Sequence, residues 1–218
     1  MGGKSPLRIF LKGNDDLAGS LLSADEGGRA RRGLRDLIQE KYGEAIRIDL
    51  MHEPWEDTGA ADGRLFAAEP DVVVLSLQPF LERPGLNGFE GAGGLKESFL
   101  RIIASVKERL DAHVIVYNCS SYDPADLTHN FYGREETLTL RIQKYNMALM
   151  EISAREGISI IDVDRLIAGL AGERHVVAPL RYSAETYQAM GLEFLRVLED
   201  IGFFENRPLI RQIGRKED

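Results

Sequence analysis

The chain has 218 residues, of which 44% are hydrophobic and 28% are charged. These values are typical of a soluble globular protein and exclude a disordered or fibrous chain, and the length fits one domain over 1–218 with a polar tail at 203–218. The 27 basic and 35 acidic side chains leave a net charge of −8, which disfavours binding to nucleic acid or to an anionic membrane surface.

Cysteine content and hydropathy indicate the compartment. The single cysteine, Cys119, excludes an intramolecular disulfide and a thiolate metal cluster, and we expect it to be buried and inert. No apolar run approaches the roughly 20 residues that cross a bilayer, and residues 1–6 lack the apolar stretch of a secretory signal. We therefore expect a cytoplasmic protein.

Five short apolar segments have the composition of β-strands. The third is almost continuously apolar and β-branched, as expected of a central strand covered on both faces. In chain order, the predicted strands span 7–11, 45–50, 71–77, 113–117 and 158–163.

Segments with helical periodicity lie between and after these strands. An Arg-rich helical stretch separates the first two, and Asp162 is predicted to cap the helix that follows the last. Between Arg134 and Glu156, apolar residues recur every three or four positions, which predicts one apolar stripe along a helix. The stripe consists of Leu138, Ile142, Tyr145, Leu149 and Ile152.

The last helix is predicted to begin after Ser183, a preferred N-cap residue, and to end near Gly202. Its apolar side consists of Tyr187, Met190, Phe194 and Leu198.

Strands that alternate with helices predict a doubly wound α/β fold, with a five-stranded parallel sheet and helices on both faces. In such sheets, ligands bind beyond the carboxyl ends of the strands. The loops expected at that edge are 13–16, 52–63, 78–79, 118–132 and 176–182.

Two adjacent carboxylates stand where the first strand ends and the first helix begins. At this position the helix dipole favours the negative charge of Asp15 and Asp16. They either cap the helix or bind a cation or substrate hydroxyls at the switch point of the sheet, and the sequence leaves both interpretations open.

Three of the four histidines, His52, His129 and His175, are expected in loops at or near the same edge. Imidazole is the most common general base, but loop histidines are also common without a catalytic role, so each is a candidate only. None has the spacing of a metal-binding motif, and no cofactor motif is present, so we expect neither a zinc site nor a cofactor.

The layout resembles the SGNH/GDSL hydrolases, a family of esterases, lipases and acetylhydrolases. Residues 13–19 read GNDDLAG, similar to the family's first block G-D-S-L-x-x-G, and residues 58–65 read TGAADGRL, with Gly59 in the place of the oxyanion-hole glycine. Residues 184–187 read AETY, similar to the A-E-x-Y that often follows the family's last block, D-x-x-H. The resemblance spans nearly the whole chain and implies a three-layer, flavodoxin-like fold.

The same alignment places unusual residues at the positions that carry the family's chemistry. Asp15 falls on the nucleophilic serine, Gln78 on the oxyanion-hole asparagine, and Ala178 and Arg181 on the catalytic aspartate and histidine. A guanidinium stays protonated at physiological pH, so Arg181 cannot act as a general base. Because triad members act as a unit, we expect serine-esterase activity to be weak or absent.

The first hypothesis is a small acyl, sugar or anionic ligand bound at the family's site. Asn14, Asp15, Gly59, Gln78 and Arg181 would converge there. Asn118, after the fourth strand, is a further ligand-binding candidate.

Two alternatives remain open. In one, the protein is a working hydrolase or acyl transferase in which Asp15 or Asp16 is the base and His175 or His129 the acid. In the other, it is a non-catalytic partner domain in a biosynthetic assembly or a homo-oligomer, docking through the apolar residues of 203–210.

Overall fold

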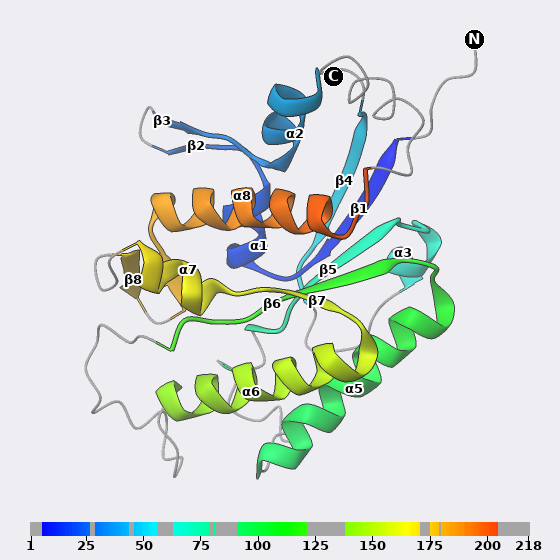
Figure 1. The fold of residues 1–218 in the computed structure, drawn as a ribbon, viewed down its shortest axis with the longest axis vertical. Coiled ribbons are helices and arrows are strands. Elements are labelled where there is room, and N and C mark those ends of the chain that lie inside the picture. Colours follow the sequence, from blue (N-terminus) through cyan, green and yellow to red (C-terminus); the bar gives the residue numbers. More distant parts are fainter. Residues whose placement is uncertain are drawn as a thin grey trace.

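A computed structural model describes residues 6–26, 29–43, 46–55, 63–78, 81, 91–121, 138–170, 175–178 and 180–204. Five strands form one parallel sheet in the order β4-β1-β5-β6-β7 (Figure 1). They are β1 (Leu7–Lys12), β4 (Ile48–Glu53), β5 (Val72–Ser76), β6 (His113–Tyr117) and β7 (Ser159–Ile161). The predicted fold class is confirmed.

The second strand of the sheet lies three residues later than the sequence indicated. β4 pairs with β1 along its whole length, from Leu7 opposite Ile48 to Lys12 opposite Glu53. The apolar residues before Ile48 suggested an earlier start, and the polar end of the strand resembled a loop. The prediction failed because β4 is an edge strand of the sheet. Polar residues can pair in an edge strand, so its polar end was mistaken for a loop.

The last strand is shorter than predicted because a helix begins sooner. Val163 is already the first residue of α7 (Val163–Gly169), and Asp162 is its N-cap, accepting a hydrogen bond of 3.1 Å from the backbone N–H of Arg165. The capping role predicted for Asp162 is confirmed.

One face of the sheet is covered by α1 (Asp15–Leu21), α2 (Leu34–Tyr42), α7 and α8 (Ala184–Asp200). α8 begins as predicted, because the Ser183 hydroxyl accepts a 3.2 Å hydrogen bond from the backbone N–H of Thr186. Met190, Phe194 and Leu198 are buried against the sheet, whereas Tyr187 is half-buried.

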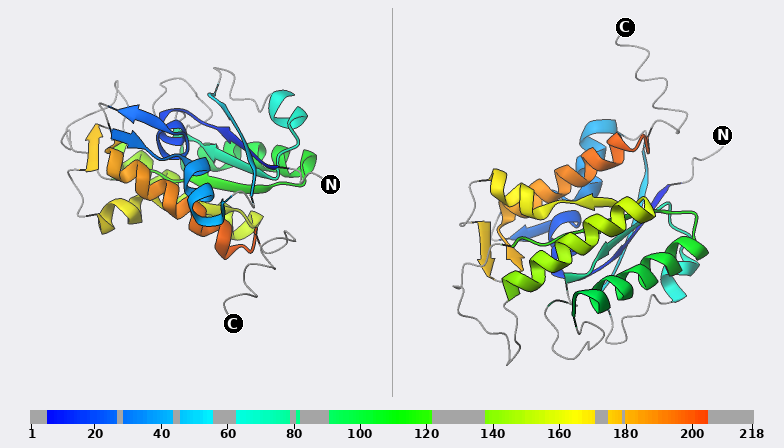
Figure 2. Two further views of the ribbon diagram at one scale, coloured as in Figure 1. Left: turned by 90° about the horizontal axis from the view of Figure 1, so that it is seen from above. Right: turned by 60° about the horizontal axis from the view of Figure 1, so that its bottom comes forward.

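The other face is covered by α3 (Gly63–Ala67), α5 (Gly91–Arg109) and α6 (Leu138–Glu156). Figure 1 shows α5 and α6 below the sheet and α1, α2 and α8 above it, and the right view of Figure 2, which brings the bottom forward, shows α5 and α6 in front. All five residues of the predicted α6 stripe are buried. In β5 and β6, successive apolar residues are buried alternately on the two faces of the sheet, so the sequence of each strand is a nearly continuous apolar run.

Two short hairpins were missed by the sequence analysis. The pair β2 (Ala24–Glu26) and β3 (Arg29–Arg31) lies in the stretch expected to be helical, which corrects that expectation. The pair β8 (Val176–Ala178) and β9 (Arg181–Tyr182) lies before α8. Strands of two or three residues are too short to show a period, although the Gly-Gly pair at 27–28 is a hairpin signal.

Within the described ranges, no helix has both the length and the apolar character needed to span a membrane.

Candidate functional site

The carboxyl end of β1 turns directly into α1 through Gly13 and Asn14. A Cβ atom on Gly13 would lie 2.6 Å from Cδ1 of Leu17 and 2.8 Å from Cβ of Ser76. Only a residue without a side chain therefore lets α1 start this close to the end of β5. The start of α1 is where the sequence alignment places the nucleophile of the SGNH/GDSL hydrolases, and the backbone of Asp15 occupies that position.

Trp55 links the ends of three strands at this edge. Its indole Nε1 donates a 2.7 Å hydrogen bond to the carbonyl oxygen of Ser76, and its backbone N–H donates a 3.4 Å bond to Oδ1 of Asn14. Nearby, Nε2 of His52 lies 2.9 Å from the carbonyl oxygen of Gly13. A carbonyl only accepts, so Nε2 carries a proton in this contact, and the neutral tautomer with that proton has its acceptor at Nδ1.

Asp16 points into the protein, where it binds Ser76. Only 3% of Asp16 is exposed, and its Oδ2 accepts a hydrogen bond from the Ser76 hydroxyl. The same hydroxyl accepts a 3.3 Å bond from the backbone N–H of Gln78. The structure therefore uses Asp16 to join α1 to the end of β5.

Three buried tyrosines stand around this carboxylate. Burial raises the pKa of Tyr117, Tyr145 and Tyr182 above the usual value, and the negative charge of Asp16 raises each further. The three phenols therefore stay protonated at physiological pH. Tyr117 accepts a 3.3 Å hydrogen bond from Ser20, and Tyr182 accepts one of 3.1 Å from the backbone of Ser120.

Gln78 connects the β5 loop to the β8–β9 hairpin. Its Nε2 donates a 2.7 Å hydrogen bond to the carbonyl oxygen of Leu180, a buried residue with a φ of 58°. Arg181 follows immediately and is exposed, and no carboxylate among the described residues forms an ion pair with it. The tie to Gln78 thus fixes the backbone beside a solvent-facing guanidinium.

His175 lies at the start of the same hairpin but is buried, with 6% exposed. Its Nδ1 is 3.2 Å from the Ser183 hydroxyl, and its carbonyl oxygen accepts a 2.8 Å bond from the backbone N–H of Ser183. These contacts hold the hairpin against the start of α8. A role for His175 as a catalytic acid stays a prediction.

Asn118 uses both ends of its amide to join β6 to α7. Its Oδ1 accepts a 2.6 Å hydrogen bond from the backbone N–H of Val163, and its Nδ2 donates a 2.9 Å bond to Oδ1 of Asp162. This arrangement gives Asn118 a capping task that the sequence did not indicate, and ligand binding by it stays a prediction.

Three predicted site features lie outside the described residues: Gly59, His129 and the side chain of Asp15. Of the other candidates, the hydrogen bonds draw Asn14, Asp16 and Gln78 together around Ser76 and Trp55, with Arg181 one residue beyond Leu180. His175 and Asn118 are engaged at the starts of α8 and α7 instead.

A buried ion pair at this edge was missed. Lys12, fully buried, lies 3.1 Å from the carboxylate of Glu53 and 5.3 Å from the ring centroid of Trp55. Arg64 approaches the other oxygen of Glu53 at 3.6 Å. The sequence signal for this pair is a basic residue, Lys12, at the end of β1 and an acidic residue, Glu53, at the end of β4. The predicted second strand stopped at residue 50, so Glu53 was not placed beside Lys12.

Cys119 is buried, as predicted, and its inertness stays a prediction. Across the described ranges, the acidic, histidine and cysteine side chains form no group of three or more that could hold a metal ion.

Comparison with solved structures identifies the fold. A catalytic mutant of an acetylxylan esterase from Geobacillus stearothermophilus superposes with a TM-score of 0.63 at 12% identity, covering 90% of this chain and 95% of that chain. A member of the lipolytic G-D-S-L family from Veillonella parvula superposes with a TM-score of 0.60 at 13% identity, covering 88% of this chain and 98% of the other.

An alpha/beta hydrolase enzyme from the metagenome of Lake Arreo, Spain, is similar to the same extent, with a TM-score of 0.59, 12% identity and coverage of 87% and 93%. No protein-family model matches the sequence, and no curated protein is significantly similar to it. The likeness therefore lies in the fold, which is that of the SGNH/GDSL hydrolases.

Proposed function

We propose that this SGNH/GDSL-like fold binds a small ligand with an anionic group, and with an acyl or sugar part, at the carboxyl edge of the sheet. The site lacks the Ser-His-Asp mechanism of esterases. The observation that carries the proposal is Arg181, an exposed guanidinium without an ion-pair partner among the described residues, on a hairpin held in place by Gln78.

The residue types at this edge support binding more than acyl transfer. In the alignment with the family motifs, Arg181 stands at the histidine position, and a guanidinium cannot accept the proton of a nucleophile. Its planar fork instead matches the two oxygens of a carboxylate or phosphate. The serine position holds Asp15, and Ser76, the described serine at the end of β5, is buried and bound to Asp16.

The ligand class follows from the same groups. Arg181 supplies the charge for an anionic group, while Asn14, half-buried at the start of α1, presents an amide to a hydroxyl or acyl oxygen. One of the similar structures is described as an acetylxylan esterase, which makes acylated acidic sugars the first ligands to test.

The test is a thermal-shift titration with a defined panel: acetate, phosphate, glucuronate and acetylated glucuronate. We expect one or more of these anions to raise the melting temperature of the wild type. Arg181→Ala should lower the affinity about tenfold or more, because it removes a charge-assisted pair of hydrogen bonds.

The matched control is Arg47→Ala. Arg47 is also exposed, but it precedes β4 and so lies at the opposite edge of the sheet. Its removal should leave the ligand effect unchanged. Equal effects of the two substitutions, or no response to any anion in the panel, would contradict the proposed site.

A second candidate function rests on His52. This exposed histidine donates from Nε2 to the carbonyl of Gly13, next to the start of α1, and Nδ1 of a ring in this tautomer can accept a proton from a bound water. A hydrolase with Asp15 and His52 as the activating pair is therefore the alternative. It predicts ester hydrolysis that is lost in both Asp15→Ala and His52→Ala and kept in Arg47→Ala.

A further inference from the structure

The outer face of α6 carries large apolar side chains that face solvent. Leu140 is 41% exposed, Met147 is 67% exposed and Met150 is 62% exposed. Only three other large apolar residues of the described chain are exposed, and they lie on β8, on α8 and just after α8. Half of these exposed large apolar residues thus lie on one helix. We call these three residues the outer stripe.

The outer stripe is continuous along the helix. With 100° of rotation per residue, its members fall within an arc of roughly 80°, opposite the buried stripe that packs on the sheet. Gln143 and Ala154 are also exposed and fall in the same arc, so no charge interrupts it. A second apolar face, opposite the one that packs on the sheet, is typical of a helix that also contacts a partner.

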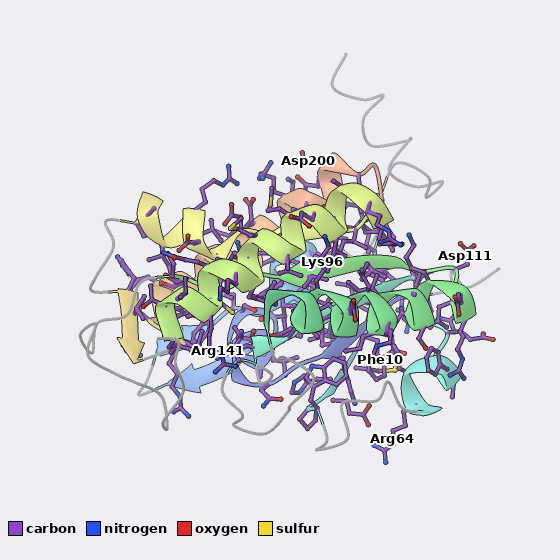
Figure 3. The ribbon with its side chains drawn as sticks, turned by 90° about the horizontal axis from the view of Figure 1, so that it is seen from below. Phe10, Arg64, Lys96, Asp111, Arg141 and Asp200 are labelled. Carbon is purple, nitrogen blue, oxygen red and sulfur yellow. The ribbon has the colours of Figure 1, made fainter. Side chains whose placement is uncertain are left out.

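Charges flank the outer stripe on the side of α5. Glu151 forms an ion pair with Lys96 of α5, which fixes the direction of this flank, and Lys144 lies on the same flank two turns earlier. Figure 3 shows α5 and α6 side by side on this face, with Lys96 between them. Met147 lies midway between Lys144 and Glu151.

This arrangement is complementary to itself. If two copies of α6 meet antiparallel about a two-fold axis beside Met147, Lys144 of each copy faces Glu151 of the other. A parallel arrangement would instead place the charged flank of one helix against the uncharged flank of its partner. Opposite charges across an interface fix its register, so the pattern selects the antiparallel pairing.

We propose that two copies of the chain associate through the outer stripe as a symmetric antiparallel dimer, with Met147 nearest the axis. The same patch is used on both copies, so the contact closes after two subunits. Three apolar side chains and two flanking pairs make a surface smaller than the about 800 Å² per partner of a standard interface. The dimer is therefore expected to depend on concentration.

The first test is sedimentation velocity of the full chain between about 1 and about 300 µM, a range suited to a weak dimer. The wild type should shift from monomer to dimer. Met147→Glu buries two carboxylates at the axis and should raise the dissociation constant about tenfold or more. The control Leu192→Glu alters a side chain that is 48% exposed on α8 and should change nothing.

A charge exchange tests the register. Lys144→Glu alone and Glu151→Lys alone each create two like-charge contacts and should weaken the dimer, whereas the double variant restores the pairing and should recover it. Thermal unfolding of each variant checks the fold, since Glu151→Lys also removes the ion pair with Lys96. A wild type that stays monomeric, a dimer insensitive to Met147→Glu, or a double variant without recovery would overturn the proposal.

Discussion

Lys12 shows how a single residue can shape this edge of the sheet. Its ammonium group is entirely removed from solvent, which is costly unless a counter-charge and a polarisable surface accompany it. Glu53 supplies the charge at 3.1 Å and Trp55 the ring at 5.3 Å, and the same Trp55 binds Asn14 and Ser76. The ion pair therefore supports the group that connects β1, β4 and β5.

We predict that Lys12→Met destabilises the protein by about 3 kcal/mol, because it leaves the largely buried carboxylate of Glu53 without its nearest cation. The double variant Lys12→Met with Glu53→Gln should recover most of this loss, since no buried charge then remains unpaired. Urea unfolding of the wild type, the single variants Lys12→Met and Glu53→Gln and the double variant measures the coupling energy between the two side chains. A single Lys12→Met variant as stable as the wild type would show that the pair contributes nothing.

Individual residues of the candidate site differ in how far the sequence could predict them. Asp15 and Arg181 are candidates because of their positions relative to the family motifs, which depend only on the order of residues in the chain, and their roles stay predictions. The task of Asn118 could not be foreseen, since it depends on where α7 begins in space. Asp16 was seen as a cap or a ligand, and its bond to Ser76 depends on the approach of β5.

At the scale of the elements, the packing of α1 against the end of β5 depends on Gly13. Any Cβ at this position would meet Leu17 and Ser76 at less than 3 Å. The central strand β5 was predictable from the sequence because both of its faces are buried. Such a strand is a nearly continuous run of apolar, mostly β-branched residues. The hairpins were not predictable, because two or three residues carry no period.

Two glycine substitutions separate close packing from backbone flexibility. Gly13→Ala should destabilise the protein by about 2 kcal/mol, because α1 must shift to admit the methyl group. Gly169→Ala is the control: a Cβ there meets nothing within 4 Å at the last residue of α7, so the change should be neutral or stabilising by up to about 1 kcal/mol. Urea unfolding compares the two, and equal effects would refute the close approach at Gly13.

At the scale of the whole molecule, the pH dependence of stability reports on His113, at the amino end of β6. Burial lowers the pKa of this imidazole below 6.5, and the charge of Lys107 lowers it further. The unfolded chain therefore binds a proton more readily than the folded one as the pH falls below 6.5, so the free energy of unfolding decreases there.

The matched variant is His113→Gln, which keeps a polar group near the Ser159 hydroxyl, 2.9 Å from the histidine ring. We expect the wild type to lose more stability than this variant between about pH 7.5 and about pH 5.5, measured by urea unfolding. Identical losses in the two proteins would mean that His113 titrates alike in both states.

We propose for this SGNH/GDSL-like fold a ligand site that works without serine chemistry. The most direct test is the rate of p-nitrophenyl acetate hydrolysis by pure wild type beside Asp15→Ala and Arg181→Ala. We predict the uncatalysed background rate in all three, because Asp15 stands at the serine position of the family motifs and Arg181, at the histidine position, cannot act as a general base. Turnover above background in the wild type that vanishes in Asp15→Ala would contradict the account and establish a rebuilt catalytic site.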